Sequence, residues 1–61
     1  MEKEDIKYYC EKNIKITLSG NDYQYNGYIE KLSDKYLLFK DKYNKIVLIS
    51  YKDIKTIREN I

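Results

Sequence analysis

A change of hydrophobic period at Asn13 constrains the fold of this chain more than any other feature of its sequence. Before that point, the segment "EKEDIKYYCEKN" places Ile6, Tyr9 and Cys10 at the i, i+3 and i+4 positions of a helix. The spacing predicts one short amphipathic helix within residues 1–12. After it, the segment "NIKITLS" alternates apolar and polar residues, which is typical of a half-buried strand.

The rest of the chain predicts four more short strands separated by polar turns. The run "YQYNGYIEKL" alternates, and the glycine inside it, Gly27, indicates a sharp bend or a close approach of another backbone. The runs "YLLFK" and "KIVLIS" are apolar at consecutive positions, which is typical of strands covered on both faces. The segment "IKTIRE" is the last predicted strand. We therefore predict a single mainly β domain over residues 1–61 with one N-terminal α-helix. Residues 13–59 are predicted to form a small, strongly bent, five-stranded open barrel.

The small size of the chain indicates that it needs support from outside its own core. Below roughly 70–80 residues a lone core seldom supplies more than about 3–5 kcal/mol. Cys10 is the only cysteine of the 61 residues and there is no histidine, so we expect neither a disulfide nor a metal site. A strand edge carrying "IVLI" is open to pairing with another strand, so we expect a homo-oligomer.

The charge is nearly balanced, with 12 basic against 10 acidic residues. A net charge of +2 is too small for a protein that coats nucleic acid by charge alone. Residues 14–61 nevertheless hold nine of the basic residues against six acids, so an anionic partner is expected on the β-rich part. No stretch reaches the roughly 18 apolar residues of a membrane span and the N-terminus is acidic, so we expect a cytoplasmic chain without membrane contact.

Two polar-aromatic segments flank the apolar runs: "DKY" at 34–36 and "SYKD" at 50–53. They are either ordinary turns or the two sides of one binding pocket. Enzymatic activity is not expected, because there is no histidine for general-base catalysis, no glycine-rich phosphate loop, and Cys10 lies on the apolar face of the predicted helix. No cofactor is expected either.

The order of elements resembles the Sm-like (LSm) superfamily, and within it the bacterial Hfq branch. The resemblance rests on a helix followed by five bent strands, with Gly27 in the second strand, Asp34 in the next turn, Tyr36 after it and Thr56 in the stretch "ISYKDIKTI". It implies a ring of six or seven copies whose strands pair across subunits. It also implies single-stranded RNA, rich in uridine or adenine, bound near the pore, and a role as an RNA chaperone or post-transcriptional regulator.

The resemblance also implies which residues bind RNA. An aromatic face that stacks a base contributes about 1–3 kcal/mol, and cations contact the phosphates. The predicted RNA-binding residues are Lys35, Tyr36, Tyr51 and Lys52, and the residues of a possible second RNA face are Tyr23, Tyr25 and Thr56. Gly27 and Asp34 are expected to be structural, with Asp34 tying its loop by bonding backbone amides.

A protein-interaction module is the alternative hypothesis. The Lys-His pair that marks Hfq falls on Tyr51 and Lys52, and the Arg-Gly pair of other Sm proteins falls on Ser50 and Tyr51. An SH3-like or YolD-like adaptor without RNA binding has the same strand pattern and uses its edges and aromatics on a peptide or protein partner. Turn lysines are also commonly solvated, and Tyr36 is equally compatible with a packed strand residue.

Overall fold

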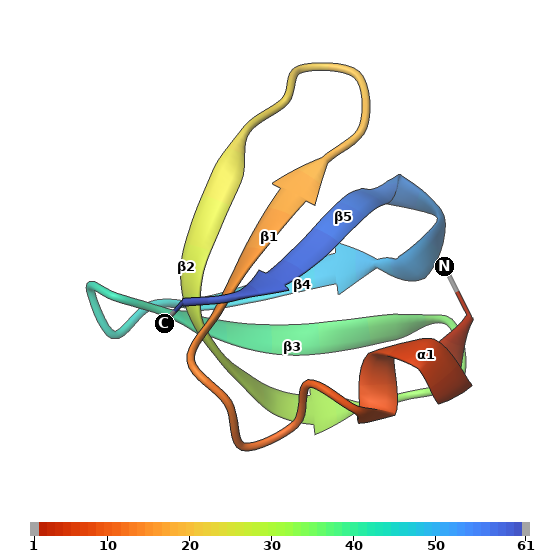
Figure 1. Ribbon diagram of the computed structural model, residues 1–61, viewed down its shortest axis with the longest axis horizontal. Helices are drawn as coiled ribbons and strands as arrows, with labels where there is room; N and C mark the ends of the chain where they lie inside the picture. Colours follow the sequence, from red (N-terminus) through yellow and green to blue (C-terminus); the bar gives the residue numbers. More distant parts are fainter. Residues whose placement is uncertain (1, 61) are drawn as a thin grey trace.

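Five strands, one short helix and one 3-10 turn make up the fold (Figure 1). The computed structural model describes residues 2–60, so Met1 and Ile61 of the predicted domain lie outside the described part. The elements are α1 (Lys3–Lys7), β1 (Ile14–Leu18), β2 (Gln24–Leu32), β3 (Tyr36–Asp41), β4 (Ile46–Ser50), η1 (Tyr51–Asp53) and β5 (Ile54–Glu59). Each strand agrees with its sequence-based prediction to within one residue at either end.

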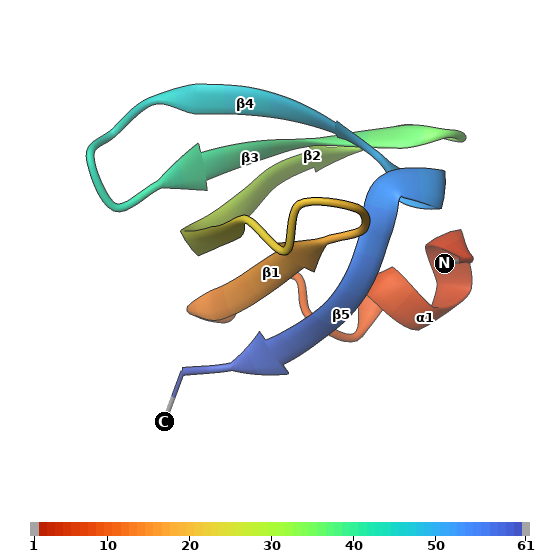
Figure 2. The same cartoon turned by 90° about the horizontal axis from the view of Figure 1, so that it is seen from above.

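The strands form one antiparallel sheet in the order β4-β3-β2-β1-β5. Figure 2 shows how the sheet curls, with β3 and β4 on one side, β1 and β5 on the other, and α1 at one end. The mainly β class with an N-terminal helix is therefore confirmed. A closed barrel is not formed by residues 2–60, because β4 and β5 are the two edges of the sheet and do not pair with each other.

The helix is much shorter than the predicted residues 1–12. It ends at Lys7, and the following amides bond three residues back, Tyr9 N to Ile6 O at 2.9 Å and Cys10 N to Lys7 O at 3.2 Å. Glu11 then adopts a φ of 66°, which reverses the chain toward β1. Ile6 is fully buried, and Tyr9 packs against the core, as the helical spacing predicts. Among residues 2–60 no helix is long and apolar enough to cross a membrane.

The core lies on the concave face of the sheet, and alternate strand residues fill it. The buried apolar residues are Ile6, Ile14, Ile16, Leu37, Phe39, Ile49, Tyr51, Ile54 and Ile57. The opposite, outer face of β4 is not covered within one copy, where Ile46 is 54% and Leu48 is 61% exposed. The prediction that β3 and β4 are covered on both faces is therefore wrong for the outer face of β4, because no element of residues 2–60 packs there.

Gly27 is the point where β2 passes closest to β3. It pairs with Asp41 and has a φ of 157°. A Cβ atom at this position would lie 1.9 Å from the carbonyl oxygen of Lys40. The close backbone approach expected from a glycine inside a strand is thus present, and any larger residue is excluded sterically.

Candidate nucleic-acid interface

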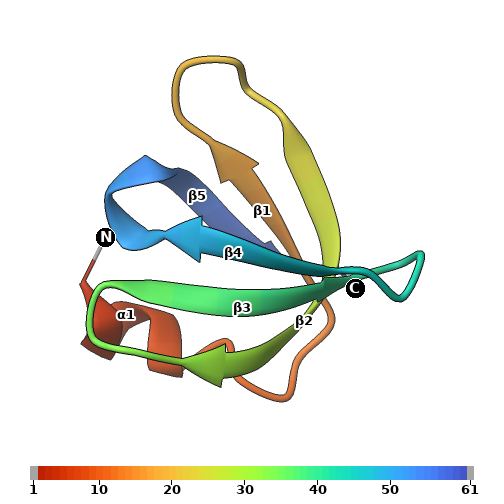
Figure 3. The same cartoon turned by 180° about the vertical axis from the view of Figure 1, so that it is seen from behind.

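The two polar-aromatic segments meet at one end of the sheet. Since β3 and β4 are antiparallel neighbours, the start of β3 lies beside the end of β4, and Tyr36 pairs with Ser50. The backbone amide of Tyr51 donates to the carbonyl of Lys35 at 3.0 Å, and the Tyr51 hydroxyl donates to the carbonyl of Ser33. Figure 3 shows the start of β3, the end of β4 and α1 at this same end of the molecule.

A groove of about 480 Å³ lies between these segments and the start of the helix. We call it the loop groove, and its lining residues are Glu2, Lys3, Asp34, Lys35, Ser50, Tyr51 and Lys52. Lysines and acids are mixed along it, so it is polar with only a small basic excess. Of the four predicted RNA-binding residues, the structure places Lys35, Tyr51 and Lys52 in this lining.

Tyr51 is buried beneath the groove, with only 5% of its surface exposed. Burial raises the pKa of its phenol, and the nearby Asp34 carboxylate adds to the rise. The phenol therefore stays protonated and donates its hydrogen to the turn that carries Ser33. A buried ring offers no face to a base, so Tyr51 acts by holding the two segments in place.

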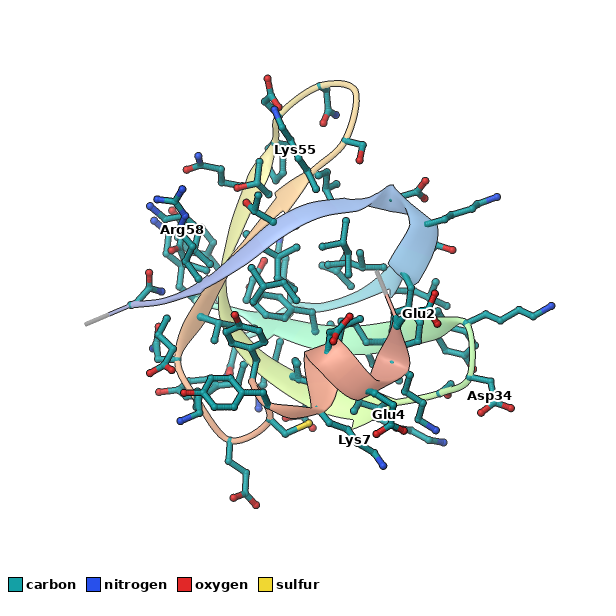
Figure 4. The ribbon with its side chains drawn as sticks, turned by 45° about the vertical axis from the view of Figure 1, so that its right-hand side comes forward. Glu2, Glu4, Lys7, Asp34, Lys55 and Arg58 are labelled. Atoms are coloured by element: carbon teal, nitrogen blue, oxygen red, sulfur yellow. The ribbon has the colours of Figure 1, made fainter. Side chains whose placement is uncertain are left out.

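Asp34 makes a different contact from the predicted one. Its side chain is 96% exposed and pairs with the ammonium of Lys3 at 3.4 Å, instead of accepting bonds from loop amides. The prediction is wrong because Tyr51 already holds the turn, which leaves the carboxylate free to point outward. Figure 4 shows Glu2 and Asp34 at this end of the molecule. Lys3 enters the groove from α1, and the sequence offers no signal for a contact across 31 residues.

Tyr36 lies next to the loop groove and not in its lining. It begins β3 opposite Ser50, which does line the groove, and 36% of the Tyr36 residue surface is exposed. A base bound in the groove therefore reaches Tyr36 only at the groove's β3 side.

The residues of the predicted second RNA face are not brought together. The rings of Tyr23 and Tyr25 contact each other at a centroid distance of 4.7 Å. Tyr25 pairs with Ile16 of β1, whereas Thr56 pairs with Thr17, the next residue of β1. Successive strand residues point to opposite faces, so Tyr25 and Thr56 lie on opposite faces of the sheet.

A second hollow, which the sequence does not indicate, lies at the Gly27 bend. It measures about 590 Å³ and is lined in part by Asn13, Asn26 and Tyr28. The Asn60 side-chain amide donates to the side-chain oxygens of Asn13 at 2.7 Å and Asn26 at 3.2 Å, which joins the residue after β5 to the residue before β1 and to β2. Within residues 2–60 no group of three or more His, Cys, Asp or Glu side chains gathers in the way that a metal ion requires.

Comparisons of the chain with protein-family models, with curated proteins and with solved structures find no match. The fold and the site together define a small open-sheet module. It carries a polar groove between two loops at one end and an exposed apolar strand, β4, along one edge.

Proposed function

We propose that this chain is an Sm-like RNA-binding protein that holds single-stranded RNA, rich in uridine or adenine, at the loop groove and acts as an RNA chaperone or post-transcriptional regulator. The supporting observation is the meeting of the "DKY" and "SYKD" segments, joined by the bond from the Tyr51 amide to the Lys35 carbonyl.

The chemistry of the groove suits a single strand better than a duplex. Unpaired bases expose their faces for stacking, and their phosphates accept contacts from cations. Tyr36 supplies a partly exposed ring at the groove's side, and Lys3, Lys35 and Lys52 supply ammonium groups. Tyr51 contributes by fixing the positions of these groups.

We further propose that copies associate through the free edges of the sheet. The resemblance implies a ring of six or seven copies, in which the bent sheet would serve as an open barrel whose edges neighbours complete. Repeating the loop groove in an assembly raises the affinity for a long strand through avidity.

Fluorescence anisotropy with labelled single-stranded oligonucleotides at several salt concentrations tests the RNA proposal. Tyr36→Ala should weaken binding by about 1–3 kcal/mol per engaged site, with the salt slope nearly unchanged. Lys52→Ala should instead lower the slope of log affinity against log salt by roughly 0.7 for each phosphate that the lysine neutralises. Lys3→Ala should behave like Lys52→Ala, because both lysines line the groove.

Lys15→Ala is the matched control, because Lys15 sits on the interior strand β1, between Asn26 and Arg58, and does not line the groove. It should change neither the affinity nor the slope. The proposal fails if the parent protein binds no oligonucleotide more tightly than about 10⁻⁴ M at moderate salt, which is the weak end of non-specific binding.

The exposed Ile46 and Leu48 on edge strand β4 favour a second candidate function, the adaptor without RNA binding. An extended peptide adds to such an edge as an extra strand and places its side chains beside the apolar pair. This candidate predicts that Leu48→Lys abolishes capture of a partner while Lys52→Ala leaves it intact, the reverse of the RNA proposal.

A further inference from the structure

The two free edges of the sheet differ in how well they are protected against pairing. Strand β5 carries exposed Lys55 and Arg58, which Figure 4 shows projecting from it. Its register against β1 shifts between Thr17 and Leu18, which leaves Lys55 as an extra, bulged residue. Charged side chains and bulges are the features that keep an edge strand from pairing with another chain.

Strand β4 has neither of these features. Its sequence "IVLIS" contains no charge, and its five residues pair with β3 without any shift of register. Alternate residues of β4 direct their N–H and C=O groups away from β3, where no strand of residues 2–60 meets them. Its outer side chains, Ile46 and Leu48, are more than half exposed, and Leu48 lies beside Leu38 of β3.

We infer that β4 pairs with β4 of a second copy, antiparallel, about a two-fold axis at Leu48. This register pairs the whole strand, since Leu48 faces its own equivalent, Ile46 faces Ser50, and Val47 faces Ile49. The two sheets join into one, and the seam contains no charge that opposes a like charge. A two-fold contact of this kind closes on itself and ends growth at a dimer.

The same operation on β5 is unfavourable. The bulge at Lys55 breaks the regular run of outward N–H and C=O groups, so two copies of Ile54–Glu59 do not pair along their full length. Pairing β4 with β5, as in the ring, would set an uncharged regular strand against a bulged and charged one. An edge without charge or bulge is therefore matched best by a second copy of the same edge, so a second β4 is the occupant that we assign to it.

The inferred dimer replaces the ring of six or seven copies and does not depend on RNA binding. Of the residues that line the loop groove, Ser50 belongs to β4 and the others lie outside the seam. Oligonucleotide binding and self-association are therefore measured separately, and either proposal can fail while the other stands.

Cysteine cross-linking tests the register directly, in a Cys10→Ser background that removes the natural thiol. Paired residues of antiparallel strands have Cα atoms about 4.5–5.5 Å apart, a separation that a disulfide spans. Leu48→Cys should form a covalent dimer under mild oxidation, and Thr56→Cys on β5 should not. The inference is overturned if Leu48→Cys fails to link with itself, or links only when mixed with Thr56→Cys, which would indicate pairing of β4 with β5.

Charge exchange at position 48 tests the same seam without a cross-link. Leu48→Lys and Leu48→Glu place charges on an exposed position, so both variants should keep the parent's circular dichroism spectrum. In native mass spectrometry each alone should dimerise at least about tenfold more weakly than the parent, and an equal mixture should restore a mixed dimer. Thr56→Lys, the matched charge on the other edge, should leave the parent's dimer intact. A monomeric parent, a parent of six or seven copies, or loss of the dimer on Thr56→Lys would refute the inference.

Discussion

The contact at Gly27 makes the substitution Gly27→Ala a severe test of the sheet's geometry. The added methyl carbon would lie 1.9 Å from the Lys40 carbonyl oxygen and 2.9 Å from the Cα of Asp41. Both obstacles are backbone atoms of β3, so no side-chain rotation relieves them. To reach an ordinary contact of 3.4 Å, β2 and β3 must separate locally by about 1.5 Å. That separation breaks the ladder where Gly27 pairs with Asp41.

The cost follows from two terms. An L residue at a φ of 157° is strained by about 1–3 kcal/mol. Displacing a packed strand to admit an extra carbon costs about 1–3 kcal/mol more. The sum, roughly 2–6 kcal/mol, is comparable with the about 3–5 kcal/mol that a core of this size supplies. Gly27→Ala should therefore be largely unfolded at 25 °C.

Far-UV circular dichroism and urea unfolding measure this effect, with Gly20→Ala as the matched control. Gly20 also has a positive φ, 87°, but a Cβ atom there meets nothing within 4 Å. The control should lose only the strain of the left-handed conformation, about 1–2 kcal/mol. If the two alanine variants unfold at the same urea concentration, the steric explanation of Gly27 is wrong.

Three further predictions concern stability. Because burial raises the pKa of Tyr51, its stabilising contribution is full below the unfolded value of about 10 and is lost as the pH rises through the higher folded value. The stability of the parent in urea should therefore fall more steeply above about pH 10 than that of Tyr51→Phe, and equal falls would contradict the prediction. Ile6→Ala should cost about 2–5 kcal/mol in thermal unfolding, because Ile6 is fully buried, whereas a loss below about 1 kcal/mol would make α1 an appendage. Asp41→Ala should lower the free energy of unfolding by about 1–2 kcal/mol, because the carboxylate accepts hydrogen bonds from the backbone amides of Tyr43 and Lys45 at 2.9 Å. Asp41→Asn keeps an acceptor oxygen and should lose less stability, and equal losses in urea unfolding would show that these hydrogen bonds are not the contribution of Asp41.

The strands could be predicted from the sequence because a period of two reports directly which face is buried. Ile14 and Ile16 are buried while Lys15 between them is not, and this alternation is visible in the letters alone. The length of the helix could not be predicted from the sequence in the same way. Ile6 and Tyr9 at i and i+3 meet the core equally well from one helical turn followed by tighter three-residue turns, so the spacing does not reveal where the helix ends.

The loop groove could be predicted only in part. A hairpin of β3 and β4 necessarily brings the start of one beside the end of the other, so the meeting of residues 34–36 and 50–53 follows from antiparallel pairing. The presence of Lys3 in the groove depends on how the chain reverses at Glu11 and places α1 against the sheet. Helix and strand propensities do not determine that reversal. Whether Tyr51 is a buried support or an exposed platform depends on the 3-10 turn that points it inward, and a tyrosine is compatible with both.

The consecutive apolar residues of β4 form a sequence pattern that one copy of the chain does not explain. The pattern predicts a strand covered on both faces, and in one copy the inner residues Val47 and Ile49 pack against or within the core while Ile46 and Leu48 face outward. Strand β5, which is also an edge, does not carry this pattern, because polar and charged residues separate its buried Ile54 and Ile57. Selection for folding alone would not distinguish the two edges in this way, since each has one face on the same core. A difference that one copy cannot explain is expected if β4 meets a second β4 and β5 meets water.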